Sequence, residues 1–214
     1  MDFTEFLKYV PKIEKEKLLA EEAHLKMSPI ERIWTFDKVD CLNKNPRKAA
    51  VMMLIYPKNN STFLALIIRN SSTGVHSSQI AFPGGKVELE DKSLAHTALR
   101  ETHEEIGIHP KKIKVIKAFT EIYIPPSNFI VAPFLGISHC EITFTEQIEE
   151  VAGIIELSII DFLNEENIVK KRMDTSYGLD IEVPTFKINE HFVWGATAMM
   201  MSELKEVLKN SFKK

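Results

Sequence analysis

Three carboxylates on one face of a predicted helix constrain this chain more than any other feature. Residues 100–109 read Arg-Glu-Thr-His-Glu-Glu-Ile-Gly-Ile-His, so Glu101, Glu104 and Glu105 fall at positions i, i+3 and i+4. On a helix these positions are neighbours, and like charges there repel one another by about 0.2–0.5 kcal/mol per pair. Hard divalent cations such as Mg²⁺ prefer carboxylate oxygens and usually share them with substrate phosphates. The pattern therefore indicates either a solvated acidic face or a metal site that acts on a phosphorylated ligand.

Glycines on both sides of this segment favour the metal site. The stretch 82–86, Phe-Pro-Gly-Gly-Lys, precedes the helix in a chain that has only 8 glycines among 214 residues. Adjacent glycines allow a backbone to approach a ligand closely. Gly107 stands where a glycine commonly ends a helix. We therefore expect a short strand, a glycine-rich loop and a helix near residues 93–106 that carries the carboxylates.

This arrangement resembles the Nudix box, the signature of Nudix hydrolases. The box reads Gly, five residues, Glu, seven residues, then Arg-Glu-apolar-any-Glu-Glu-any-Gly-apolar. Its second half matches residues 100–108, with Thr102 in the apolar position. In its first half Asp91 follows Gly85 by six positions, where Glu is usual, and Arg100 follows Asp91 by nine positions instead of eight.

The resemblance implies a fold and a set of site residues. The fold is an α/β/α sandwich, in which a mixed β-sheet lies between helices. Mg²⁺ or Mn²⁺ is bound by Glu101, Glu104 and Glu105, and Arg100 locks one of these carboxylates in place. Nudix enzymes often supply a further carboxylate as metal ligand or general base from the region before residue 151, and we select Glu150 over Glu149. The predicted catalytic residues are Arg100, Glu104 and Glu150.

Residues 69–85 resemble the signature of one Nudix subgroup, the coenzyme A pyrophosphatases. Arg69 leads, seven positions on, to the stretch 76–85, His-Ser-Ser-Gln-Ile-Ala-Phe-Pro-Gly-Gly. The chain departs from the signature at Asn70, where a small residue is usual, at Gly74, where a basic residue is common, and at Ser78, where glycine is usual. Residues 123–129 and 194–198 also match. The resemblance implies substrate contacts by Arg69, His76, Gly84, Gly85 and Lys86.

Three activities remain open at this stage. The subgroup resemblance implies metal-dependent cleavage of coenzyme A or acyl-coenzyme A into 3′,5′-ADP and 4′-phosphopantetheine or its acylated form. The departures at residues 70, 74 and 78 leave room for a Nudix pyrophosphatase of another nucleoside diphosphate derivative, such as ADP-ribose or an oxidised nucleotide. A non-catalytic Nudix domain that senses a nucleotide is the third alternative, and the complete set of helix carboxylates argues against it.

Composition limits the class of protein. The chain has a net charge of −3, with 27% charged and 44% hydrophobic residues, which is typical of globular proteins and argues against a general nucleic-acid binder. The longest apolar run, residues 49–56, is far shorter than the roughly 20 residues that span a bilayer. We expect a cytoplasmic protein with a small-molecule substrate and no membrane or nucleic-acid partner. A homodimer is possible because Nudix proteins are often dimers.

The hydrophobic pattern predicts the order of elements. Residues 1–34 are predicted to be helical with a break near Pro11, and residues 1–46 form an N-terminal helical extension that serves packing or dimerisation. The Nudix hydrolase domain is predicted over residues 47–214. Its strands are expected at 50–56, 63–69, 80–82, 113–124, 129–137 and 151–157, with a hairpin at 186–194 and a last helix at about 196–208.

Overall fold

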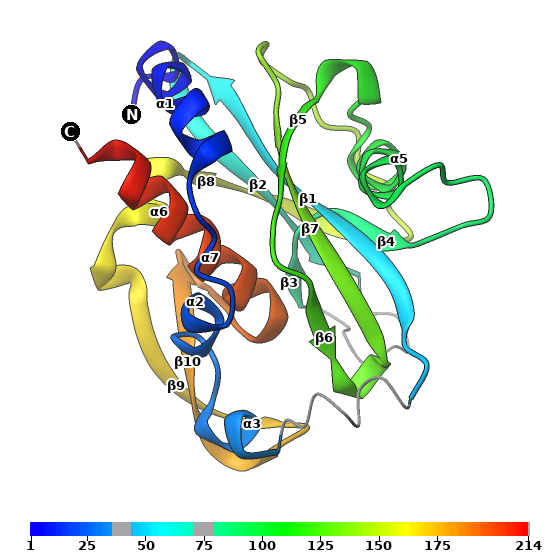
Figure 1. The fold of residues 1–214 in the computed structure, drawn as a ribbon, viewed down its shortest axis with the longest axis vertical. Coiled ribbons are helices and arrows are strands. Elements are labelled where there is room, and N and C mark those ends of the chain that lie inside the picture. Colours follow the sequence, from blue (N-terminus) through cyan, green and yellow to red (C-terminus); the bar gives the residue numbers. More distant parts are fainter. Residues whose placement is uncertain (36–43, 71–78, 214) are drawn as a thin grey trace.

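A mixed β-sheet forms the centre of the computed structural model, which describes residues 1–35, 44–70 and 79–213 (Figure 1). Strand β1 (Arg47–Lys58) runs antiparallel to β2 (Ser61–Arg69) and parallel to β7 (Phe129–Ile137). The strand order is β3-β2-β1-β7-β5, while β4, β6 and β8 pair with β1, β7 and β2 respectively. The bounds of the remaining strands are Ile80–Ala81 (β3), Gly84–Lys86 (β4), Lys114–Ala118 (β5), Ile122–Ile124 (β6) and Val151–Ser158 (β8).

Helices cover both faces of this sheet, so the predicted sandwich is confirmed. Helix α5 (Leu94–Ile106) lies against one face, and α7 (Gly195–Phe212) lies against the other (Figure 1). Side chains of β1 alternate between the two: Met52 and Leu54 pack with α5, whereas Met53 and Ile55 pack with α7. Because successive strand residues point to opposite faces, a continuous apolar run is what a strand buried on both sides requires.

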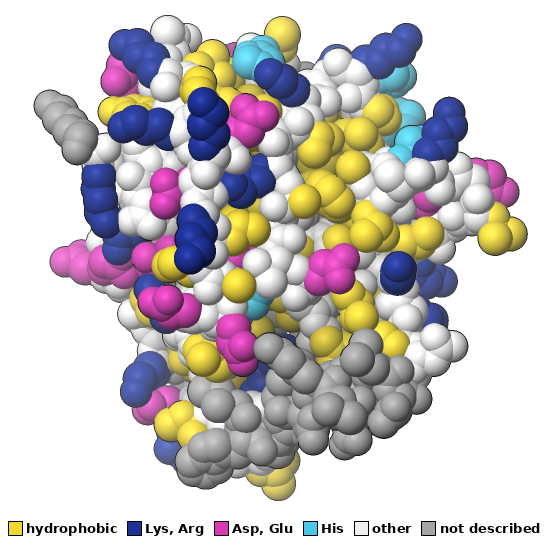
Figure 2. All heavy atoms as spheres, in the orientation of Figure 1, with side chains coloured by type: hydrophobic (Ala, Val, Ile, Leu, Met, Phe, Trp, Pro, Cys, Tyr) yellow, Lys and Arg dark blue, Asp and Glu magenta, His cyan; other side chains and the backbone are white. Residues whose placement is uncertain are grey.

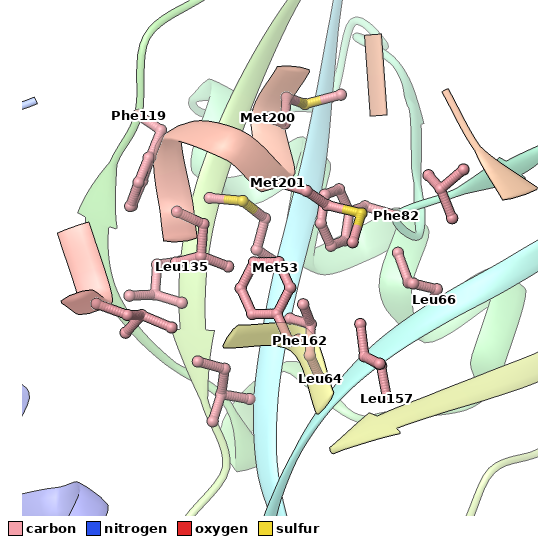
Figure 3. Close-up of a cluster of buried hydrophobic side chains, with 14 of the residues drawn as sticks. Met53, Leu64, Leu66, Phe82, Phe119, Leu135, Leu157, Phe162, Met200 and Met201 are labelled. Carbon is pink, nitrogen blue, oxygen red and sulfur yellow. The ribbon is translucent and has the colours of Figure 1, made fainter. Parts of the chain in front are cut away.

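The larger hydrophobic cluster lies between the sheet and α7. Figure 3 shows Met201 of α7 beside Phe82, and Met53 and Leu135 of the sheet in the same cluster as Phe162. Phe162 belongs to α6 (Ile159–Leu163), which follows β8. On the α5 side, partly buried hydrophobic residues continue the second cluster toward the surface. Figure 2 shows hydrophobic side chains gathered between β5 and α5.

The N-terminal helices pack on the same cluster as α7. Helix α1 (Phe3–Lys15) is capped by Asp2 and buries Phe6 and Ile13 against it, and α2 (Glu21–Leu25) contacts α7. The predicted break at Pro11 is wrong, because α1 continues through Pro11 to Lys15. Pro11 has no N–H to donate to the carbonyl one turn before it. Pro11 is exposed, so this carbonyl can bond to water. A further helix, α3, spans Ile30–Thr35.

Two further differences from the predicted elements are found, one before β7 and one after β8. The expected strand at 113–124 is divided into β5 and β6. A separate three-stranded sheet, β9 (Ile168–Thr175), β10 (Gly178–Ile188) and β11 (His191–Val193), contains the predicted hairpin but also a strand that we did not predict. Within the part of the chain that the structure describes, no helix is both long enough and apolar enough to cross a membrane.

Lys117 ties the end of α1 to the sheet, and its removal is expected to destabilise the protein. Its Nζ donates hydrogen bonds to the carbonyl oxygens of Glu14 (3.0 Å) and Glu16, which no helical N–H reaches. We expect Lys117→Met to lower the free energy of unfolding by about 1–2 kcal/mol, since it leaves these acceptors unsatisfied. Urea denaturation measures this change, and an unchanged midpoint would show that Lys117 does not hold α1.

Candidate active site

Local sequence signals place α5 with its carboxylates beside β1 and β4. Ser93 begins the helix, because its hydroxyl accepts a hydrogen bond from the N–H of His96 at 3.1 Å. Gly107 ends it in the left-handed conformation, at φ +74°, which glycine adopts without strain. Thr102 fills a fully buried position by donating its hydroxyl to the carbonyl of Ala98 at 2.6 Å. A polar residue is therefore accommodated where the Nudix box has an apolar one.

Arg100 is held by Asp91 through two hydrogen bonds. Arg100 Nε lies 3.1 Å from Asp91 Oδ1, and Nη2 lies 3.0 Å from Oδ2. Asp91 is 0% exposed and also accepts hydrogen bonds from Thr97 Oγ1 and the backbone N–H of Glu88. The Arg100 guanidinium keeps the pKa of Asp91 far below its usual range. Asp91 therefore anchors the arginine despite the extra residue between them.

The same guanidinium contacts two of the helix carboxylates. Arg100 Nη1 lies 3.0 Å from Glu101 Oε1 and 2.8 Å from Glu104 Oε2. A third contact joins Nη2 to the backbone carbonyl of Lys86 at 2.9 Å. Glu104 is 53% exposed, whereas Glu101 is mostly buried, and burial raises the pKa of Glu101. Arg100 thus connects β4 to the acidic face of α5.

Glu105 is the buried centre of the site. It is 1% exposed; its Oε2 accepts a hydrogen bond from the N–H of Gly84 at 2.8 Å, and its Oε1 lies 3.5 Å from Arg69 Nη1. Burial raises the pKa of Glu105 to about 8, although these two partners oppose the shift. The negative charges of Glu101 and Glu150 raise it further. The site therefore holds more negative charge than its two arginines neutralise.

The glycine pair of β4 permits this close approach. A Cβ at Gly85 would lie 2.5 Å from both carboxylate oxygens of Glu101, so no larger residue fits there without displacing that carboxylate. A Cβ at Gly84 would lie 2.6 Å from the Cα of Val51 on the neighbouring strand. Both glycines are thus required by the packing of β4 between β1 and α5. The sequence had placed them in a loop that approaches a ligand, whereas they form strand β4.

Comparisons with known proteins decide the family. The family model described as the NUDIX domain matches residues 46–170. The chain belongs to the Nudix hydrolase family. It is 33% identical over 169 residues to "Uncharacterized Nudix hydrolase NudL" of Yersinia enterocolitica, a match that covers 76% of this chain and 82% of that protein. It is thus an enzyme of a family that cleaves pyrophosphate bonds and generally uses divalent metal ions such as Mg²⁺.

Two more distant relatives extend the comparison. "Nudix hydrolase 22, chloroplastic" of Arabidopsis thaliana is 29% identical over 195 residues, which cover 88% of this chain and 64% of the plant protein. The crystal structure of RenU, a Nudix hydrolase from M. smegmatis, is 14% identical with a TM-score of 0.53 and covers 77% of this chain and 87% of that one. The RenU likeness supports the shared fold alone.

In this Nudix hydrolase the ligand atoms of the site are of the kind that a hard cation such as Mg²⁺ prefers. Its carboxylates offer only oxygen ligands, and burial raises the pKa values of Glu101 and Glu105. As the side chains lie, no three His, Cys, Asp or Glu residues in the described ranges are arranged to hold a metal ion. The carboxylates of Glu101 and Glu104 both contact the Arg100 guanidinium.

The metal-free Nudix hydrolase is expected to lose stability as the pH rises from about 5 to about 8. Because the folded-state pKa of Glu105 is about 8, against an ordinary 4.5, the folded protein binds this proton more tightly than the unfolded chain. The resulting contribution to the free energy of unfolding is fully present below pH 4.5. It falls by about 1.4 kcal/mol per pH unit and is lost as the pH passes 8. Urea denaturation in EDTA measures it, and Glu105→Gln should flatten the dependence. A flat wild-type profile would contradict a buried, protonated Glu105.

Most of the predicted site residues lie together in this Nudix hydrolase. Lys86 was predicted to contact the substrate. Its side chain is exposed and has no contact with the site in the described residues, while its backbone carbonyl accepts a hydrogen bond from Arg100. His76 lies outside the described residues. One contributor was not predicted as a site residue: Asp91 departs from the Nudix box in both residue type and spacing, yet it anchors Arg100. The residues that converge are Arg69, Gly84, Gly85, Arg100, Glu101, Glu104, Glu105 and, through its charge, Glu150.

Proposed function

We propose that this Nudix hydrolase cleaves the pyrophosphate bond of coenzyme A or acyl-coenzyme A. One observation carries the proposal. The segment that resembles the coenzyme A pyrophosphatase signature begins at Arg69 and ends at Gly85, and both ends meet the same carboxylate. Arg69 Nη1 lies 3.5 Å from Glu105 Oε1, and the N–H of Gly84 donates to Glu105 Oε2 at 2.8 Å. The two described ends of this segment therefore lie at the same carboxylate of α5.

The chemistry follows from the charges of the site. Glu101, Glu104 and Glu105 would hold Mg²⁺ or Mn²⁺, which would supply positive charge against the pyrophosphate and a bound water of lowered pKa. Arg100 holds Glu101 and Glu104 in place, and Arg69 adds positive charge beside the phosphates. Glu150 accepts a proton from the attacking water. The attack breaks the bond between the two phosphates and releases 3′,5′-ADP and 4′-phosphopantetheine.

A comparison of substrates tests the proposed specificity. We expect kcat/KM for coenzyme A to exceed that for ADP-ribose and for a nucleoside triphosphate by at least about 100-fold, because only coenzyme A fills both the pyrophosphate site and the site implied by the signature of residues 69–85. Quantification of the products by mass at matched Mg²⁺ concentrations measures all three. A preference for ADP-ribose would leave metal-dependent cleavage at α5 standing and contradict coenzyme A as the substrate. Absence of turnover with all three would support a nucleotide-sensing role.

A further inference from the structure

The turn that carries Glu150 is attached to the last turn of α5. Residues 147–150 form this turn before β8, and the carbonyl of Gln147 accepts hydrogen bonds from the N–H groups of Glu150 (2.9 Å) and Val151 (2.8 Å). The N–H of Gln147 in turn donates to the carbonyl of Glu105 at 2.9 Å. One end of the turn is therefore held at the backbone of the buried site carboxylate.

Asn70 holds the other end of the turn. Its side-chain Nδ2 donates to the carbonyl of Ile148 at 2.9 Å, and its backbone N–H donates to the carbonyl of Glu150 at 2.8 Å. Asn70 directly follows β2, whose last residue is Arg69. The residue that replaces a small side chain in the subgroup signature thus makes a hydrogen bond that a small apolar side chain cannot make.

A bulge in β8 brings the two segments into this position. Ile68 pairs with Gly153, but Arg69 pairs with Val151, so Ala152 is an extra residue on β8. Such bulges bend a strand and redirect the residues beside it. Here the bulge places Glu150 opposite Asn70 and next to Arg69, which contacts Glu105. The effect of Glu150 on the pKa of Glu101 and of Glu105 agrees with a position near both carboxylates.

We propose that Asn70 is a positioning residue, whose side-chain amide holds the turn 147–150 so that Glu150 faces the carboxylates of α5. The effect on catalysis rests on the proposed function. The fixed conformation of the turn rests on the hydrogen bonds alone. Its reason is physical: an exposed turn keeps one conformation only where its backbone groups are bonded, and Asn70 supplies two of the bonds that link this turn to β2.

Hydrogen exchange tests the positioning directly. In Asn70→Ala, the N–H groups of Glu150 and Val151 should exchange about 10-fold faster than in the wild type, since the turn opens more often. Asn167→Ala is the matched control, because Asn167 Nδ2 makes the same kind of bond to the carbonyl of Asp161 at 2.8 Å, outside the site. Asn70→Asp, which keeps the size and loses the donor, should behave as Asn70→Ala does. Equal exchange in all variants would overturn the proposal.

A double-mutant cycle tests the consequence for turnover of coenzyme A with Mg²⁺. We expect Asn70→Ala to lower kcat about 10-fold with little change in KM, as loss of a residue that orients a catalytic group does. In a Glu150→Gln background it should cause no further loss, because the residue that it positions is already disabled. Additive losses would overturn the proposal. If the wild type leaves coenzyme A intact, the proposed function fails, and the exchange rates still decide the role of Asn70.

Discussion

Replacement of Glu104 by glutamine is expected to reduce turnover about 1,000-fold, a size typical for loss of one charge that stabilises a transition state. Glu104 is the more exposed neighbour of Glu101 on the acidic face, and Arg100 Nη1 holds its carboxylate at 2.8 Å. Glutamine retains an acceptor for Arg100 but cannot supply the negative oxygen that a divalent cation requires. Steady-state kinetics with coenzyme A and Mg²⁺ measure the loss.

The stability of the Glu104→Gln variant separates catalysis from folding. Because Glu104 is 53% exposed, the substitution should change the free energy of unfolding by less than about 0.5 kcal/mol. Glu146→Gln is the control, since Glu146 is an exposed acid in the loop before β8. Wild-type turnover in Glu104→Gln would remove this carboxylate from the metal site and leave Glu101, Glu105 and Glu150 as the candidates.

Replacement of Asp91 by alanine is expected to destabilise the protein by about 1.5–3 kcal/mol, because it removes two charge-assisted hydrogen bonds from a largely buried guanidinium. Asp91 makes both hydrogen bonds to Arg100 and is 0% exposed. Turnover should fall as well, since Arg100 is then free to leave Glu101 and Glu104. Urea denaturation at pH 7 measures the first effect, and kcat at a temperature where the variant remains folded measures the second.

The chain contains a matched exposed pair for this experiment. Asp180 also binds an arginine through two oxygens, with Arg172 Nε at 2.9 Å and Nη2 at 2.8 Å, but both side chains are more than half exposed. Solvent screens such pairs, so Asp180→Ala should leave the urea midpoint almost unchanged. An equal cost for the two variants would show that burial of Asp91 does not set its contribution.

The spacing of residues predicted the helix but could not predict its anchor. A helix has a fixed period, so the positions of Glu101, Glu104 and Glu105 determined their common face. The loop before it has no period, so the sequence did not predict that Asp91 pairs with Arg100. In the structure the loop turns at Glu88, whose N–H bonds Asp91 Oδ2 at 3.0 Å, and the turn absorbs the extra residue.

Strand prediction succeeded where both faces are buried and failed where neither is. The apolar runs of β1 and β7 indicated central strands, as found. Strand β9 contains Lys170, Lys171 and Arg172 and has no regular alternation of buried residues, so its sequence resembles a loop. It is held instead by its pairing with β10 and by ion pairs such as Lys170 with Glu182 at 2.7 Å. These depend on a partner strand, which a local pattern cannot identify.

Mass analysis of the products tests the central claim most directly. The wild-type protein is incubated with coenzyme A, with Mg²⁺ or with EDTA, and the products are identified by mass. The account predicts equal amounts of 3′,5′-ADP and 4′-phosphopantetheine in Mg²⁺ and intact coenzyme A in EDTA. Intact coenzyme A in both samples, or cleavage that continues in EDTA, would contradict metal-dependent hydrolysis of this substrate at the carboxylates of α5.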